Sequence, residues 1–151
     1  RKKERRKILR KAAKPLLAAA KNNINPASKP VHRYSTGKVV QDIKAPKGSG
    51  TIIATYMPNN LKNALKILTF RKSANVFVGP KLAKRNNKGT FGQGNKVDGW
   101  YAHFVEFGTV HQPAQHYMRN AVDKTKATVQ RLIIKGITDK LKKFVNKHKI
   151  K

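Results

Sequence analysis

The chain contains no cysteine and very few acidic residues, and these two shortages remove several classes of function. Without thiols there can be no disulfide framework, no cysteine nucleophile and no zinc ribbon. The 6 Asp plus Glu in 151 residues leave little from which to build a hydrolase, because such sites use carboxylates as acids and bases. We therefore expect a protein that is not an enzyme and that needs no cofactor.

Long apolar runs and nucleotide-binding motifs are also missing. No run approaches the roughly 18 apolar residues that span a bilayer, and the best stretch, Pro15–Ala20, is too short for a signal-peptide core. No phosphate-binding loop of the type G-x-x-x-x-G-K-[ST] occurs, and no zinc-finger or RNA-binding aromatic motif is visible. We expect a soluble protein that makes no membrane contact and has no visible means of reading a nucleic-acid sequence.

Positive charge is abundant. The 35 Lys plus Arg give a formal net charge of +29 and a pI near 11.0, which implies a polyanion or an acidic protein as partner. At 17.0 kDa the chain fits one domain, residues 1–151. Two segments are candidates for the contact, a basic arm over residues 1–10 and a flexible basic loop over residues 80–98, through Arg1, Lys2, Lys3, Arg5, Arg6, Lys7, Lys84, Arg85 and Lys88. The alternative for both segments is an ordinary solvated surface.

Apolar periodicity predicts two helices at the ends of the chain. Residues 1–24 carry an apolar stripe at 3.6-residue spacing, which Pro15 interrupts, so we expect a kink or a split there. Residues 117–146 repeat apolar side chains every three or four positions and predict a long final helix. Gly136 inside that helix costs about 1 kcal/mol relative to Ala, which indicates close packing or a bend.

Strand signals fill part of the middle of the chain. Thr51–Met57 is rich in β-branched residues and lies between Gly50 and Pro58. The alternating segments Lys66–Arg71 and Ala74–Gly79 predict a hairpin. Short strands at Val31–Tyr34 and Lys38–Ile43 are also possible.

The segment Gly99–Val122 is the densest in chemistry, with five of the eleven aromatic residues and three of the five histidines. The spacing of Trp100, Phe104 and Phe107 predicts the buried face of a short helix, with Gly108 as its left-handed C-terminal cap. A turn containing Pro113 then leads to the final helix.

A metal or acid–base site in this segment is the enzymatic alternative, built on His103, Glu106, His111 and His116. Their spacing matches no zinc pattern, and no second acid is close in sequence. Glu106 is better explained by an ion pair with a cation such as Arg119 or with a neighbouring subunit.

The same segment resembles a known family. Four pieces of it, Tyr101–Thr109, Gln112–Gln115, Tyr117–Arg119 and Ala121–Val122, are similar to the signature of the tail-completion or head–tail joining proteins of long-tailed bacteriophages. Three positions depart from the family pattern: His116 and Asn120 stand where proline is usual, and Tyr117 replaces phenylalanine. These departures loosen the predicted start of the last helix.

Two weaker matches support the resemblance. Asn60–Ile67 is similar to a second family motif, in which a helical turn leads into a strand, and Thr36–Ile43 is a rival for that place. Val78-Gly79-Pro80 resembles the motif that ends the following strand.

The resemblance implies an α+β fold, with a small antiparallel sheet packed by a basic N-terminal helix and a long C-terminal helix, and with long mobile loops. It also implies a structural virion protein that assembles in the host cytoplasm and forms a ring, expected to be a hexamer, at the neck of the tail. Its partners would be the tail tube, the head connector and non-specifically the genomic DNA in the channel. The residues expected to pack between or within subunits are Trp100, Tyr101, Phe104, Glu106, Phe107, Gly108, Thr109, Pro113, Tyr117 and Arg119.

A free nucleic-acid-binding protein of nucleoid or ribosomal type is the alternative. Its support is the net charge and the basic ends of the chain.

Overall fold

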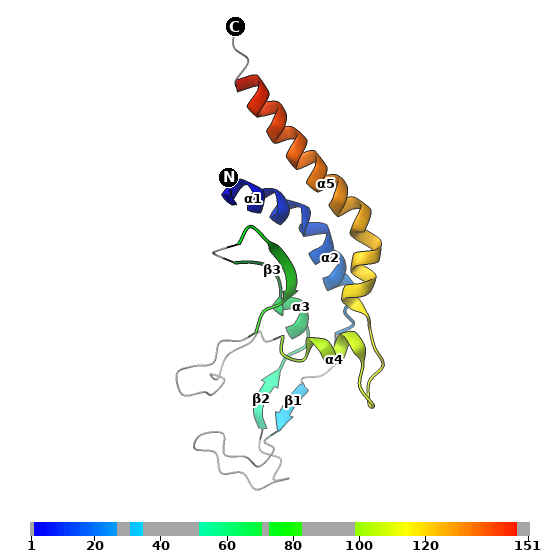
Figure 1. Ribbon diagram of the computed structural model, residues 1–151. Coiled ribbons are helices and arrows are strands. Elements are labelled where there is room, and N and C mark those ends of the chain that lie inside the picture. The colour runs from blue at the N-terminus through cyan, green and yellow to red at the C-terminus, as the bar shows by residue number, and fades with distance from the viewer. Residues whose placement is uncertain (1, 27–30, 35–51, 71–72, 83–98, 148–151) are drawn as a thin grey trace. The chain divides into compact units, whose positions relative to one another are not determined.

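The computed structural model describes residues 2–26, 31–34, 52–70, 73–82 and 99–147. These residues fall into two compact units. The helical unit comprises Arg1–Asn23, Lys66–Gly79 and His116–Lys151, and the corner unit comprises Ile24–Leu65 and Pro80–Gln115. Figure 1 shows the elements of both units along the chain.

Two N-terminal helices open the helical unit, α1 (Lys2–Ala12) and α2 (Lys14–Asn22). The predicted interruption at Pro15 is confirmed, because Pro15 lies in the first turn of α2, where its missing N–H costs nothing. Backbone hydrogen bonds still bridge the junction, from Ala13 N to Leu9 O at 2.9 Å and from Leu17 N to Ala13 O at 3.1 Å. The proline therefore divides the helix without reversing the chain.

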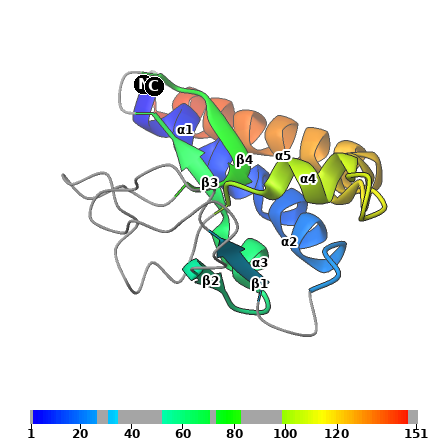
Figure 2. The same ribbon diagram turned by 90° about the horizontal axis from the view of Figure 1, so that it is seen from below.

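The last helix, α5 (Tyr117–Lys147), packs along both N-terminal helices, and Figure 2 shows the three lying side by side. Asn23 Nδ2 donates to Tyr117 O at 3.1 Å, which joins the end of α2 to the start of α5. Small residues are buried in this unit, among them Ala12, Ala20 and Ala121. The predicted close packing at Gly136 is confirmed: a Cβ atom there would lie 2.6 Å from Ile8 Cγ2.

The predicted hairpin is confirmed as β3 (Leu65–Thr69) paired with β4 (Val76–Pro80). Arg6 of α1 binds the hairpin at Phe70, which follows β3, and at Ser73, which precedes β4: Arg6 Nη2 donates to Phe70 O at 2.9 Å and to Ser73 O at 2.7 Å. The Phe70 and Phe77 rings meet edge to face, with centroids 5.3 Å apart. Arg6, predicted from the sequence as a contact for DNA or an acidic partner, thus also stabilises the helical unit.

The corner unit contains β1 (Val31–Tyr34), β2 (Ile52–Tyr56) and α3 (Asn60–Ala64). β1 and β2 are antiparallel, with Val31 opposite Tyr56 and a register shift between Arg33 and Tyr34. These strands lie where the sequence predicts them, and the predicted helical turn that leads from Asn60 into a strand is also confirmed. The possible strand Lys38–Ile43, its containing motif Thr36–Ile43 and residues 83–98 of the basic loop lie outside the described residues.

The α+β fold class is confirmed. The antiparallel pairing within the described ranges takes the form of two separate two-stranded sheets, β1–β2 and β3–β4. That residues 1–151 act as one domain stays a prediction.

Candidate assembly interface

The aromatic corner is built on α4 (Ala102–Phe107), which ends at the residue predicted from the sequence. Gly108 follows with φ +80° and ψ 177°, so the predicted positive φ is confirmed, whereas the extended ψ is not that of a left-handed helical cap. Gly108 N still donates to Phe104 O at 2.9 Å. The chain then folds back tightly, and Gln115 N donates to Val105 O at 2.9 Å.

The predicted buried face of this helix is wrong. Val105 and Ala102 are buried, whereas Phe107 is 75% exposed, Phe104 is 39% exposed and Trp100 is half-buried. The reason is that α4 begins at Ala102, so Trp100 precedes the helix and the i, i+3 pair of Ala102 and Val105 takes the inner face. The rings instead contact one another, with Trp100 and Phe104 edge to face at 5.9 Å.

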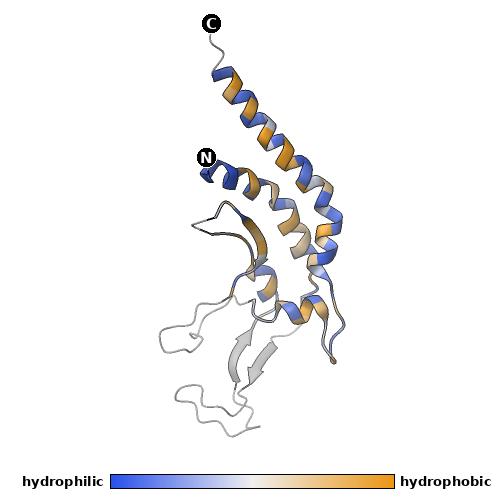
Figure 3. Cartoon of the chain, in the orientation of Figure 1, coloured by the Kyte–Doolittle hydropathy of each residue, from blue (hydrophilic) through white to orange (hydrophobic). Residues whose placement is uncertain are grey.

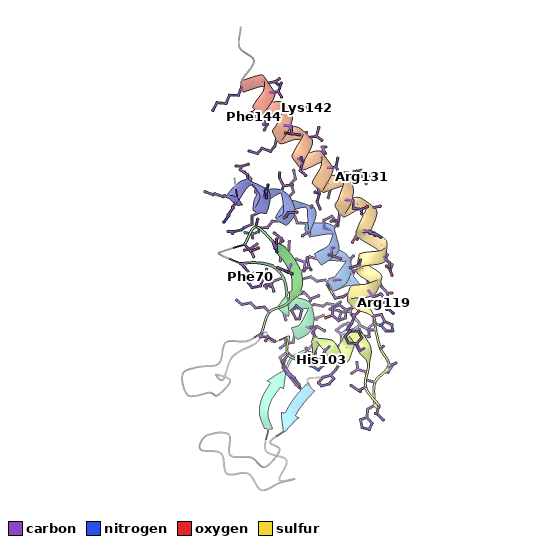
Figure 4. All side chains as sticks on the ribbon, in the orientation of Figure 1. Phe70, His103, Arg119, Arg131, Lys142 and Phe144 are labelled. Atoms are coloured by element: carbon purple, nitrogen blue, oxygen red, sulfur yellow. The ribbon has the colours of Figure 1, made fainter. Side chains whose placement is uncertain are left out.

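The other predicted packing residues are divided between the two units. Tyr117 is 2% exposed in the helical unit, where Arg119 lies at the surface of α5 (Figure 4). Thr109 and Pro113 are exposed in the turn of the corner unit, where Thr109 N donates to Gln112 O at 2.8 Å. The proposed ion pair between Glu106 and Arg119 stays a prediction.

The departures from the family pattern have a structural consequence at the start of α5. His116 has φ 47°, which the fixed ring of a proline could not adopt. Asn120 N donates to His116 O at 2.9 Å, a bond that a proline at position 120 would lack. These two residues therefore allow a start of the helix that the usual prolines would forbid.

The histidines do not build a metal site within the part of the chain that is described. His103 and His111 are exposed, and the ring of His103 lies 3.9 Å from that of Phe104. Among the described residues, no three His, Cys, Asp or Glu are placed to hold a metal ion. The described part of the corner therefore offers an aromatic surface and does not supply a set of ligands for a metal ion.

A second apolar surface lies on the C-terminal half of α5, and the apolar repeat of residues 117–146 did not predict that these side chains would be exposed. Five side chains are strongly exposed there: Ile134 65%, Ile137 48%, Leu141 60%, Phe144 62% and Val145 53%. Figure 3 shows apolar bands that continue to the end of this helix. The sequence signal that could have indicated this exposed surface is the length of the last helix: α5 has 31 residues, whereas α1 and α2 have 11 and 9.

Part of this surface forms a groove between α1 and α5, here called the α1–α5 groove, with a volume of about 860 Å³. Its apolar lining comes from both helices, namely Ile8, Leu9, Ile133, Ile137, Leu141 and Phe144. Its charged lining consists of Glu4, Arg5, Lys140, Lys143 and Lys147. The groove thus has an apolar floor and a predominantly basic rim.

The one acidic side chain of the groove is neutralised within the helical unit. Glu4 forms an ion pair with Lys140, and both side chains are about half exposed. The hydrogen bond from Lys140 and its positive charge, with a smaller effect of Lys7, lower the pKa of Glu4. The remaining rim residues, Arg5, Lys143 and Lys147, therefore set the charge that a partner would meet.

The predicted basic arm forms part of α1. Lys2, Lys3, Arg5 and Lys7 are exposed on it, and Arg6 is bound to the hairpin turn. Arg1, Lys84, Arg85 and Lys88 lie outside the described residues. Contact with DNA or an acidic protein stays a prediction for all of them.

Comparison with known proteins identifies the family. Residues 1–108 match the family described as "Bacteriophage HK97-gp10, putative tail-component". The chain belongs to this family. No match was found among curated proteins or among solved structures.

The match confirms the resemblance to phage tail proteins seen in the sequence, at the level of a tail component. It covers α1 to α4 and ends at Gly108, so the later part of the aromatic signature and α5 lie beyond it. A tail component belongs to the virion and acts with other tail or head proteins, and the structural character of the family favours a non-catalytic role. None of the helices in the described ranges combines the length and apolarity needed to cross a membrane.

Proposed function

We propose that this tail component is a ring subunit at the phage neck, of the tail-completion, tail-terminator or head–tail joining type, with six copies surrounding the DNA channel. The observation that carries the proposal is the exposed apolar surface of a chain from a tail-component family. Monomeric soluble proteins seldom expose large contiguous apolar patches, and such patches usually mark interaction sites.

The aromatic corner supplies the first contact between neighbouring subunits. Phe107, the last residue of α4, is 75% exposed, and Val110, in the hydrogen-bonded turn after Gly108, is 97% exposed. Exposed aromatic side chains are favoured at subunit interfaces because they bury large areas at a low entropic cost. The corner therefore acts by packing, and no turnover is required of it.

The net charge fits a ring around DNA. Copies with a charge of +29 repel one another, and the genomic DNA in the channel, or acidic tail and connector proteins, would lower that repulsion. Assembly would then be coupled to the tail tube and the head connector, which are the proposed partners.

The test is the assembly state of the purified chain, alone and with tail tubes, by negative-stain electron microscopy and multi-angle light scattering. We expect discrete rings, whose class averages give the number of copies. Phe107→Ser should reduce ring formation, while Phe77→Ser, a matched loss of an exposed ring in the helical unit, should leave it intact. A monomer under every condition, including with tail tubes and duplex DNA, would contradict the proposal.

The alternative is a free nucleic-acid-binding protein. The exposed cations of α1, such as Lys2, Lys3 and Lys7, favour it because they are available to phosphates. High duplex affinity of the monomer, with no rings formed, would favour this alternative.

A further inference from the structure

We infer that the α1–α5 groove is a docking site for an acidic amphipathic helix of another protein. The inference rests on the proposed function, since it names the chemistry of one partner of the assembled subunit. It concerns the helical unit alone and leaves the aromatic corner free for contacts between copies of the chain.

The groove lies between α1 and the C-terminal half of α5. At 1.5 Å per residue, α5 is about 46 Å long and α1 and α2 together are about 30 Å long. The two ends are in register at Asn23 and Tyr117, so the excess length lies at the C-terminal end of α5. Beyond the Glu4–Lys140 pair, the apolar stripe continues through Leu141 and Phe144. Figure 4 shows Phe144 near the end of α5.

A helix is the shape that fits this lining. Ile133, Ile137, Leu141 and Phe144 recur every three or four residues on α5, and Ile8 and Leu9 of α1 form the second wall. Two helices that leave an apolar groove between them are completed by the apolar face of a third. The occupant would present its own apolar residues at the same spacing.

The rim determines the charge of that helix. Arg5, Lys143 and Lys147 line the groove, and the carboxylate of Glu4 is already paired with Lys140. Acidic side chains on both flanks of the docked helix would therefore meet cations, and basic ones would be repelled.

The same charges exclude a second copy of this chain as the preferred occupant. Helix α5 carries nine Lys or Arg against two Asp, and α1 carries a single acid, Glu4. Neither helix could bring acidic flanks to a basic rim, so the partner must be a different and more acidic protein.

The lining also argues against DNA. Phosphate contacts need cations and hydrogen-bond donors, and a stacked duplex offers no apolar face to cover Leu141 and Phe144. A groove whose floor is apolar is better matched by a partner that is apolar on one side.

Three labelled peptides of about 15 residues test the inference with the full-length chain, by fluorescence anisotropy. The first carries leucines on one helical face and glutamates on both flanks. The second replaces each glutamate by lysine, and the third has the composition of the first in an order that gives no apolar face. We expect the first peptide to bind at least about tenfold more tightly than either control.

Matched variants locate the binding. Leu141→Gln should weaken the first peptide about tenfold, and Ile134→Gln, a similarly exposed position outside the groove, should leave it unchanged. Lys143→Glu should weaken it about fivefold to tenfold, and Lys135→Glu, outside the lining, should have much less effect. Circular dichroism of each variant checks that α5 is retained.

Two peptide results would overturn the inference: the second peptide, or the third, binding as tightly as the first. Two further results would also overturn it: displacement of the first peptide by a DNA duplex in a manner that depends on Leu141, or self-association of the chain that Leu141→Gln abolishes. The outcome is separable from that of the proposed ring. Rings that persist in Leu141→Gln with peptide binding lost would support both proposals, and peptide binding without rings would contradict only the ring.

Discussion

A single glycine, Gly108, allows the chain to reverse direction after α4. Its φ is +80°, and a Cβ atom there would lie 2.7 Å from Ala114 N and 2.9 Å from Gln112 O. Gly108→Ala should therefore lower the free energy of unfolding by about 2–4 kcal/mol, from backbone strain together with the clash. Urea unfolding measures this loss. Gly79→Ala is the matched control, because no atom lies within 4 Å of its added Cβ, and an equal effect of the two substitutions would refute this role of Gly108.

The carboxyl group of Glu4 gives a pH-dependent prediction. Lys140 lowers the pKa of Glu4 in the folded chain below its ordinary value of 4.5. The ion pair thus stabilises the fold above the ordinary pKa, and this contribution is lost as the pH falls through the lowered value. In Lys140→Met the pKa of Glu4, followed by NMR of its carboxyl carbon, should rise toward 4.5, whereas Lys135→Met should barely move it. The prediction fails if the Glu4 pKa is the same in all three proteins.

Individual residues were predictable from the sequence where the backbone set the requirement. Gly108 has the predicted positive φ, although its ψ is extended, Gly136 lies at a close contact, and Pro15 lies at the break in the N-terminal helix. The burial of Phe104 and Phe107 was not predictable from spacing. The smaller side chains of Ala102 and Val105 fill the inner face of α4 instead. No local rule decides which of two apolar faces of a helix turns inward.

At the scale of elements, the contact between α1 and α5 depends on the absence of a side chain at Gly136. A Cβ there would lie 2.6 Å from Ile8 Cγ2, and this methyl group, attached to the branched Cβ, moves only if the side chain rotates about χ1. Gly136→Ala should gain about 1 kcal/mol of helix propensity and lose about 2 kcal/mol to the clash, a net destabilisation of about 1 kcal/mol.

A double-mutant cycle checks this account. Ile8→Ala alone removes apolar contact and should destabilise the chain, but in the Gly136→Ala background it also removes the clash. The double variant should therefore be more stable than the sum of the two single effects. Simple additivity in urea unfolding would show that α1 and α5 do not meet closely at this point.

Helices and hairpins were largely predictable, and their pairing was not. The apolar stripe of residues 117–146 predicted α5 within a residue of its observed end at Lys147, and alternation predicted β3 and β4. The same stripe gave no sign that its first half would be covered and its second half exposed. That difference depends on where α1 and α2 contact α5, which is a relation between elements.

At the scale of the whole molecule, the order of the sequence hides how the contacts are grouped. The helical unit draws on three separate segments and the corner unit on two, and the aromatic signature Gly99–Val122 is divided between them after Gln115. A continuous motif indicated the family correctly, but it could not indicate that Tyr117 and Phe107 belong to different compact units. Long-range contacts of this kind follow from packing and have no local pattern.

Because the net charge is +29, the dependence on salt concentration distinguishes DNA binding from ring assembly through apolar surfaces. Binding of duplex DNA through six to ten phosphate contacts should weaken by about 10³- to 10⁵-fold between low and moderate salt, because counterions are released. A ring held by apolar surfaces such as Phe107 should persist over the same range, and sulfate should strengthen it. Mass photometry of the chain across a salt series, with duplex binding measured in parallel, distinguishes the two. Rings that dissolve as steeply as the DNA complex would mean that polyanion neutralisation, and not apolar packing, holds the copies together.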